Sequence, residues 1–192
     1  MSNIKEKLVS YTSVLAFCSL GVLILPPSWN LINDDRSEAL AITTLEVDEL
    51  EDNKERARKF YEIWNAHNPD ALDKVLAADY KMHSSLPGVT PDREGMKKWV
   101  GSVIAAFPDI HFTVEQQVAE GDLVMTRWSA TGTHKGPMMG IPASNKKTKV
   151  TGISVVRLRD GLSVESWGEW DAMGMMTQIG GIPQRKAPKG SN

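Results

Sequence analysis

The sequence is poor in cysteine and has little excess charge of either sign. Its 192 residues include one cysteine, Cys18, so no disulfide can form within the chain, and an apolar run around Cys18 gives it none of the features of a reactive thiol. With 22 Lys and Arg against 24 Asp and Glu, the net charge is −2, and neither end carries a long basic block. No basic field is available to hold a phosphate backbone, so we expect no nucleic-acid partner.

Motifs that bind cofactors are also absent from the sequence. It contains no Gly-rich phosphate loop, no dinucleotide fingerprint and no nucleophile elbow. No pair of His or carboxylate residues shows metal-ligand spacing together with a third partner. We therefore expect neither a cofactor nor a metal.

The first 41 residues differ in composition from the rest. Lys5 and Lys7 precede an uncharged run of 18 residues, Leu8 to Leu25. That length fits both a long signal-peptide core and a short membrane span, so cleavage after Ala39-Leu40-Ala41 and retention as an anchor both stay open. Because the two lysines stay inside, the globular part is expected on the outer side of the membrane. We predict a periplasmic or secreted protein, or one anchored by residues 8–25.

Composition divides the remainder into three segments. Residues 42–47 are predicted to be a linker. Residues 48–181 are expected to form one globular domain, since 41% apolar and 24% charged residues suffice to bury one core. Residues 182–192 are polar, contain Pro and Gly, and are predicted to be a disordered tail.

Two amphipathic helices are expected early in the domain. Charged side chains surround an apolar stripe over residues 48–68, and apolar residues follow the i, i+3, i+4, i+7 pattern over residues 91–107. A short helix is expected to open at Pro69. Residues 79–83 alternate as a short strand.

Long strands are expected in the second half of the domain. Residues 110–118 predict one strand, and residues 122–180 predict three more, followed by a short helix. Asp160 and Gly161 lie between two β-rich runs and predict a two-residue hairpin turn, because both turn positions need φ > 0. Helices followed by mostly antiparallel strands, without βαβ alternation, predict an α+β fold with helices on one face of a curved sheet.

The hairpin turn also predicts which residues pair across the last two strands. It sets Trp167 opposite Ser154 and Gly168 opposite Ile153, unless a bulge shifts the register by one residue.

The same two strands are apolar on both faces. One parity carries Val150, Val156 and Leu158, the other carries Ile153 and Val155, and Trp167 and Trp170 also lie on opposite sides. A sheet with one face in water should instead alternate between apolar and polar residues. We therefore expect a homodimer formed through the sheet.

Several runs of the sequence resemble the SnoaL-like family of polyketide and ester cyclases, which belongs to the nuclear-transport-factor-like superfamily with a cystatin-like fold. They are GDLVMTRWSATGTHKGPMMGIPASNKKTKVTGISVVRLRDG, then Trp170-Asp171 and Gln178-Ile179-Gly180, and upstream FYEIWNAHNPDALDKVLAADYKMH, together covering roughly residues 50–181. The resemblance implies a cone-shaped, curved, mixed or antiparallel β-sheet with helices packed on its concave face. It also implies a mostly apolar pocket for a small molecule.

The resemblance implies candidate catalytic residues. Cyclases of this family use a carboxylate on the last strand as general acid/base; the aligned residue here is Gly168, which leaves its neighbours Glu169 and Asp171 as candidates. Ser154 stands where the family pattern has a second His. His83, in the DYxxH segment, is the candidate for proton transfer because imidazole titrates near neutral pH, and it fits a structural role at a strand end equally well.

Further residues are expected to line the pocket. His134, in TGTHKG, is similar to a His at the rim of the family's pocket. The chain has six Trp, which suit a flat aromatic ligand, although core filling is the more ordinary role of each. The remaining expected lining residues are Trp64, Trp99, Trp128, Ser154 and Trp167.

Three functions stay open from the sequence. The first is an exported enzyme that uses His83 or a re-aimed Glu169 for cyclisation, isomerisation or hydrolysis of a small apolar carbonyl compound. The second is a non-catalytic binding or interaction module on the same fold, and the third is a membrane-tethered dimer without a pocket. A carboxyl or imidazole pointing into a closed cavity would favour catalysis, whereas a cavity showing only Trp, Met and Ser would favour binding.

Overall fold

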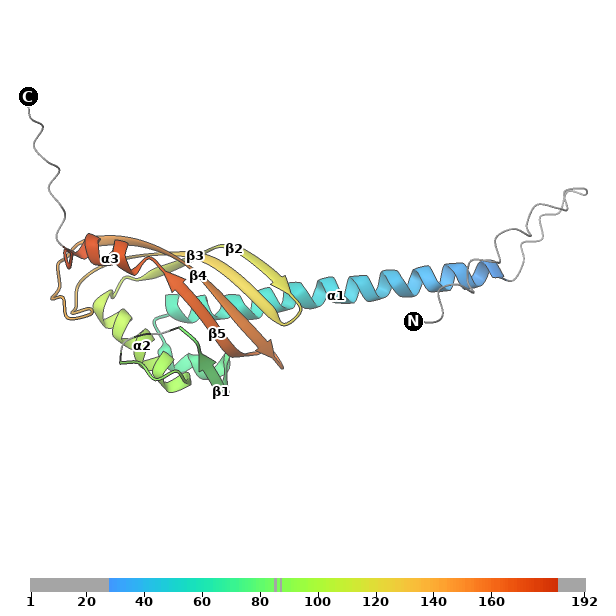
Figure 1. The fold of residues 1–192 in the computed structure, drawn as a ribbon, viewed down its shortest axis with the longest axis horizontal. Coiled ribbons are helices and arrows are strands. Elements are labelled where there is room, and N and C mark those ends of the chain that lie inside the picture. The colour runs from blue at the N-terminus through green and yellow to red at the C-terminus, as the bar shows by residue number, and fades with distance from the viewer. Residues whose placement is uncertain (1–27, 85, 87, 183–192) are drawn as a thin grey trace, which may run out of the picture. The chain divides into compact units, whose positions relative to one another are not determined.

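A computed structural model describes residues 28–84, 86 and 88–182. The elements are the helix α1 (Ser28–Asn65), the 3-10 helix η2 (Pro69–Lys74), the strand β1 (Leu76–Met82), α2 (Arg93–Ala106), β2 (His111–Glu120), β3 (Leu123–Thr133), β4 (Lys147–Arg159), β5 (Leu162–Trp170) and α3 (Ala172–Ile179). The chain divides into two units, residues 1–43 and 44–192. The second unit holds the whole sheet and the helices that pack on it (Figure 1).

The five strands form one curved, unclosed sheet in the order β1-β5-β4-β3-β2. β1 runs parallel to β5, and the other neighbours are antiparallel. The C-terminal part of α1 packs on the concave face, where Trp64 lies 4.8 Å from Phe112 of β2 between ring centroids. Val100 of α2 is fully buried in the same core. The structure therefore confirms the predicted α+β class with a mixed sheet.

The first helix is much longer than the sequence predicted. α1 begins at Ser28, whereas the apolar stripe predicted a start near Asp48. Residues 28–65 contain no Pro or Gly, so nothing in the backbone interrupts the helix before the stripe begins. The segment predicted as a linker, residues 42–47, is consequently helical, and so is the predicted cleavage triplet at residues 39–41.

The predicted export segment, residues 8–25, lies outside the described residues. So do residues 183–192 of the predicted tail. Within the described part of the chain, the helices do not include one that is both long and apolar enough to cross a membrane.

α2 begins at Arg93, two residues after the predicted start at residue 91, and Asp92 is its N-cap. The carboxylate of Asp92 accepts a hydrogen bond from the backbone N–H of Gly95 at 2.7 Å, which satisfies one of the free donors in the first turn. The helix then buries Met96, Val100 and Val103 toward the sheet, as the predicted spacing requires.

The hairpin between β4 and β5 has the predicted turn but a different register. Asp160 and Gly161 have φ values of 53° and 78°, which confirms the two-residue turn. The pairs are Ser154 with Gly168 and Val155 with Trp167, one residue away from the expected register, because the ladder shifts between Arg157 and Leu158. The predicted register allowed for a shift of one residue by a bulge, and this shift is present in the hairpin.

The outer face of the sheet carries a row of apolar side chains. Val118 pairs with Met125, Met125 with Val155, and Val155 with Trp167, so that the four share one face across β2 to β5. Val118 is 49% exposed, and Ile153 beside the row is 47% exposed. We call Val118, Met125, Val155 and Trp167 the outer row. The homodimer through this face stays a prediction.

Candidate functional site

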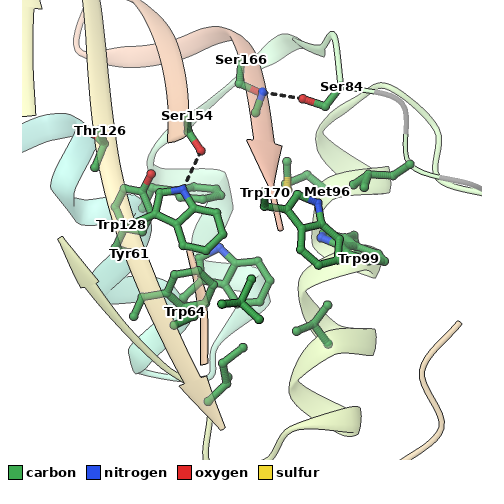
Figure 2. A pocket seen from close by; sticks show the side chains of 18 of the residues that line it. Tyr61, Trp64, Ser84, Met96, Trp99, Thr126, Trp128, Ser154, Ser166 and Trp170 are labelled. Atoms are coloured by element: carbon green, nitrogen blue, oxygen red, sulfur yellow. Dashed lines mark hydrogen bonds between the residues drawn. The ribbon is translucent and has the colours of Figure 1, made fainter. Parts of the chain in front are cut away.

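A cavity of about 170 Å³ lies between the concave face of the sheet and the helices α1 and α2. Figure 2 shows aromatic side chains from both layers converging on it. Its apolar wall includes Phe60, Trp64, Leu86, Met96, Trp99, Phe112, Trp128, Val150 and Trp170. A second hollow adjoins the cavity: it shares Ser84, Trp99 and Gly168 with the cavity wall and is also lined by Ala172, and we call it the mouth.

A group of hydroxyls forms the first polar spot in the wall. Nε1 of Trp128 donates to Oγ of Ser154 at 3.0 Å, and the hydroxyl of Tyr61 is hydrogen-bonded to Ser154 and Thr126. Burial raises the pKa of Tyr61 to about 12, in spite of those two bonds. The phenol therefore keeps its proton at neutral pH.

A second polar spot lies nearer the edge strand β1. The hydroxyl of Tyr80 is hydrogen-bonded to Oγ of Ser166, and burial raises the pKa of Tyr80 to about 12. Oγ of Ser84 accepts from the backbone N–H of Gly168 at 2.6 Å. These groups are again neutral hydroxyls, which can orient a ligand but exchange no proton near pH 7.

Glu169 is the one charged residue among the described residues that border the cavity. It pairs with Ile153, and both lie on the face opposite to Gly168, because side chains alternate along a strand. The residue is exposed. The carboxylate thus stands outside the cavity, as the period of the strand predicts.

His83 stands on the outer side of the sheet edge. Its ring stacks on Trp167, with centroids 4.7 Å apart and planes 4° apart, and its Nε2 lies 2.9 Å from Oε1 of Glu165. Nε of Arg157 donates to the other oxygen of Glu165 at 2.9 Å. The hydrogen bond from His83 and that from Arg157 hold the pKa of Glu165 below its ordinary value. His83 is not among the described residues that line the cavity.

Asp171 has a structural role at the start of α3. Its carboxylate accepts from the backbone N–H of Gly174 at 2.7 Å, and the side chain is exposed. It is therefore a helix cap, and its place in front of a short helix was the signal for that role.

His134 is fully buried, yet it lies behind the cavity wall. Its ring packs on Phe107 at 5.2 Å between centroids, and Nδ1 accepts from the backbone N–H of Ser144 at 3.3 Å. Burial lowers the pKa of His134. Nε2 has no hydrogen-bond partner within the described residues. Its position supports a role in holding the loop that follows β3.

The comparisons with known proteins agree with this architecture. A protein-family model described as SnoaL-like polyketide cyclase matches residues 54–179. The chain belongs to this family. A search of curated proteins gave no significant match.

Solved structures of SnoaL-like proteins share the fold. TsrD from Streptomyces laurentii is 29% identical, with a TM-score of 0.63 over 68% of this chain and 96% of TsrD. IdmH from Streptomyces antibioticus, a proposed polyketide cyclase, is 33% identical, with a TM-score of 0.59 over 67% of this chain and 98% of IdmH. AclR from Streptomyces galilaeus, a proposed hydroxylase, is 25% identical, with a TM-score of 0.64 over 73% of this chain and 87% of AclR.

In this SnoaL-like chain, the two positions expected to differ from the family lie side by side in the cavity. Ser154 and Gly168 are cross-strand partners. A Cβ atom on Gly168 would lie 3.5 Å from Oγ of both Ser154 and Ser84, in ordinary contact. A side chain at residue 168 would therefore point into the cavity, and glycine leaves that space open.

The predicted ligand-binding residues fall into three groups. Trp64, Trp99, Trp128 and Ser154 line the cavity. Trp167 borders it as part of β5, but its ring lies on the outer face against His83, and His134 lies behind the wall.

Sequence reasoning missed several polar lining residues, namely Tyr61, Tyr80, Ser84, Thr126 and Ser166. In the sequence pattern, Tyr61 belongs to the apolar stripe of a helix and shows no sign of a polar role. Strand register would have found Thr126, because it pairs with Ser154.

Proposed function

We propose that this SnoaL-like protein binds a small, neutral and mainly apolar molecule in its cavity without performing acid/base chemistry on it. The observation that carries the proposal is the composition of the wall: aromatic, aliphatic, methionine and hydroxyl side chains, with the bordering carboxylate of Glu169 facing outward. A charged ligand would lose its hydration without gaining a partner of opposite charge. A neutral apolar ligand gains about 25 cal/mol for each Å² that leaves water.

The dimensions of the cavity favour a ligand of one or two rings. A cavity of roughly 150 Å³ in another protein accepts benzene, and the volume here is about 170 Å³. The ring of Phe112 lies 4.8 Å from that of Trp64 and 5.1 Å from that of Trp128, with interplanar angles of 43° and 55°, so a wall of mutually tilted aromatic rings is already in place. Such walls favour flat ligands through offset and edge-on stacking.

The positions of the titratable groups argue against catalysis. An efficient general acid or base has a pKa near the working pH and lies within hydrogen-bond reach of the reacting atom. His83 and Glu169 both face the outer side. Tyr61 and Tyr80 do face the cavity, but burial raises the pKa of each to about 12.

Two further proposals concern assembly and location. The outer row and Ile153 support a homodimer in which two sheets pack face to face, since such a surface is more apolar than that of a sheet with one face in water. The run at residues 8–25 supports export, with the leader either cleaved or kept as a membrane anchor.

A pair of adjacent substitutions tests the binding proposal. Gly168→Val places a side chain in the cavity, whereas Glu169→Val places the same side chain on the outer face. We expect tetralin and similar two-ring compounds to raise the melting temperature of the wild type and of Glu169→Val. The affinity of Gly168→Val for these compounds, measured by calorimetry, should fall by roughly tenfold or more. A steric clash that costs about 1.4 kcal/mol of binding free energy corresponds to a factor of ten.

Two results would contradict the proposal. One is that no neutral compound of one or two rings binds the wild type. The other is turnover of an aromatic ketone or ester that His83→Ala or Glu169→Ala abolishes, because those residues would then reach the substrate.

A further inference from the structure

The space beside Gly168 in the cavity is surrounded by oxygen atoms. A Cβ atom on Gly168 would have three nearest neighbours: Oγ of Ser84 and Oγ of Ser154, each at 3.5 Å, and the carbonyl oxygen of Ile153 at 3.9 Å. We call this space the Gly168 niche. It joins the first polar spot of the wall, to which Ser154 belongs, with the second, to which Ser84 belongs, and Figure 2 shows both serines at the same end of the cavity.

Ser84 brings an unused hydroxyl proton to the niche. Its Oγ accepts from the backbone N–H of Gly168 at 2.6 Å, and within the described residues this is the one hydrogen bond that the side chain of Ser84 makes. Accepting a bond uses a lone pair of the oxygen and leaves the O–H free to donate. Ser84 is half-buried and lines both the cavity and the mouth, so a ligand in the cavity can reach this donor.

The hydroxyls around Ser154 also hold one proton more than the bonds among them use. Tyr61 is hydrogen-bonded to Ser154 and to Thr126, so three O–H groups share two bonds. Oγ of Ser154 accepts the indole N–H of Trp128 at 3.0 Å. Oγ1 of Thr126 accepts from Nε2 of Gln117 at 3.3 Å. Both of these partners are donors, so the region of the niche has more donors than the wall has acceptors for them.

This surplus of donors determines which polar group of a ligand fits the niche. An O–H group without an acceptor is costly when it is taken out of water, whereas an oxygen that already accepts one bond is largely satisfied. A ligand carboxylate could accept the bond, but the charged residue among the described residues that border the cavity is Glu169, which offers no opposite charge. The best match is therefore a neutral acceptor oxygen.

The distances suit an oxygen atom at this point. The two oxygen atoms of an O–H···O bond lie about 2.7–2.8 Å apart. An oxygen placed where a Cβ of Gly168 would stand has to move by only about 0.7 Å to reach that distance from Oγ of Ser84. Any other residue at position 168 would fill this point with its own carbon, so glycine is what lets a ligand atom enter.

We propose that the ligand is a compound of one or two rings that carries a neutral carbonyl group, as an aromatic ketone, ester or lactone does, and that the carbonyl oxygen occupies the Gly168 niche and accepts the hydroxyl proton of Ser84. This inference rests on the proposed function, because it names the chemical class of the ligand for the same cavity. The rings then lie against Trp128 and Phe112 of the aromatic wall. Ser84 binds and orients the carbonyl group, and no covalent bond changes.

Two ligands that differ by a ketone oxygen test the proposal. α-Tetralone has the ring system of tetralin with a carbonyl group beside the aromatic ring, and calorimetry measures the binding of each to the full chain. In Ser84→Ala the affinity for α-tetralone should fall by about fivefold, the factor that corresponds to about 1 kcal/mol for a neutral hydrogen bond. The affinity for tetralin should change by less than about twofold. Comparing both ligands on one variant removes the effect of the lost bond to Gly168.

Two further variants separate the hydroxyl proton from the size of the side chain. Ser84→Cys keeps nearly the same volume, but S–H is a weak donor, so the variant should behave as Ser84→Ala does. Thr148→Val is the matched control in the same wall. Oγ1 of Thr148 already donates to the carbonyl of Gly132 at 3.2 Å, so this variant should change the affinities for both ligands by the same factor.

Infrared spectroscopy supplies a readout that packing alone would not move. The carbonyl stretch of bound α-tetralone should lie at a lower frequency in the wild type than in Ser84→Ala, because a hydrogen bond polarises the carbonyl group. An equal frequency in the two proteins would overturn the proposal.

Three binding results would also overturn it. They are an equal loss of affinity for both ligands in Ser84→Ala, an unchanged affinity of that variant for α-tetralone, and a wild type that binds tetralin but not α-tetralone. In each of these cases tetralin still binds the wild type, and the proposed function stands. If neither compound binds the wild type, the proposed function fails and this inference fails with it.

Discussion

Removing the hydroxyl of Ser154 should reveal how the polar spot of the cavity is held together. Oγ of Ser154 accepts the indole N–H of Trp128 at 3.0 Å and is hydrogen-bonded to Tyr61. Ser154→Ala leaves the indole N–H without its acceptor, and an unsatisfied buried donor costs about 1–3 kcal/mol. Trp128 is only partly buried, since its ring faces the cavity, so we expect a loss near the lower end, about 1–2 kcal/mol.

A double-mutant cycle isolates that hydrogen bond. In a Trp128→Phe background the donor is absent, and Ser154→Ala should then cost only about 0.5 kcal/mol for the bond to Tyr61. Urea unfolding followed by far-ultraviolet circular dichroism gives all four free energies of unfolding, and the coupling should be about 1 kcal/mol. Ser102→Ala, on the exposed side of α2, serves as a control near zero. Additive losses within about 0.3 kcal/mol would refute the bond between the indole and the serine.

Three other outcomes are expected from the structure. Burial raises the folded-state pKa of Tyr61 and Tyr80 from 10.0 to about 12, so the free energy of unfolding is intact below pH 10. It should fall by up to about 2.7 kcal/mol per tyrosine as the pH rises to about 12, which urea unfolding at stepwise pH values would measure. A free energy of unfolding that does not change with pH would contradict the burial of these hydroxyls. Gly152→Ala should lower stability by about 1–3 kcal/mol in thermal unfolding, since its Cβ would lie 2.3 Å from Cζ2 of Trp128, and an unchanged midpoint would contradict that packing. Ile153→Lys should shift the mass seen by light scattering from dimer to monomer, and a wild type that is already monomeric at micromolar concentration would end the dimer proposal.

Most of the fold was predictable because its signals are local. The apolar spacing of α2 and the alternation of β2 follow from one-sided burial, and the Asp160-Gly161 turn follows from the need for positive φ at both positions. The start of α1 was not predictable in this way. Before Asp48 no apolar stripe marks the helix. The lack of Pro and Gly there is compatible with a helix but does not predict one.

The site was less predictable because it depends on register and on side-chain partners far apart in sequence. The shift between Arg157 and Leu158 moves each pair from Arg157 and Glu165 onward by one residue, and no glycine in that stretch indicates it. His83 was a candidate from its motif alone. Its actual partners, Glu165 and Trp167, are more than eighty positions away, and no local pattern links them.

The family resemblance predicted where a catalytic group would stand, and the structure shows what stands there instead. Gly168 has its side-chain position between the hydroxyls of Ser154 and Ser84, two donors that would stabilise a carboxylate at that point. Here, without a carboxylate, Ser84 binds the backbone N–H of Gly168, and Ser154 binds the indole of Trp128. In both of these hydrogen bonds the serine oxygen is the acceptor. The apolar ligand that we propose would be held by shape and burial, since Glu169, the charged residue among the described residues that border the cavity, faces outward.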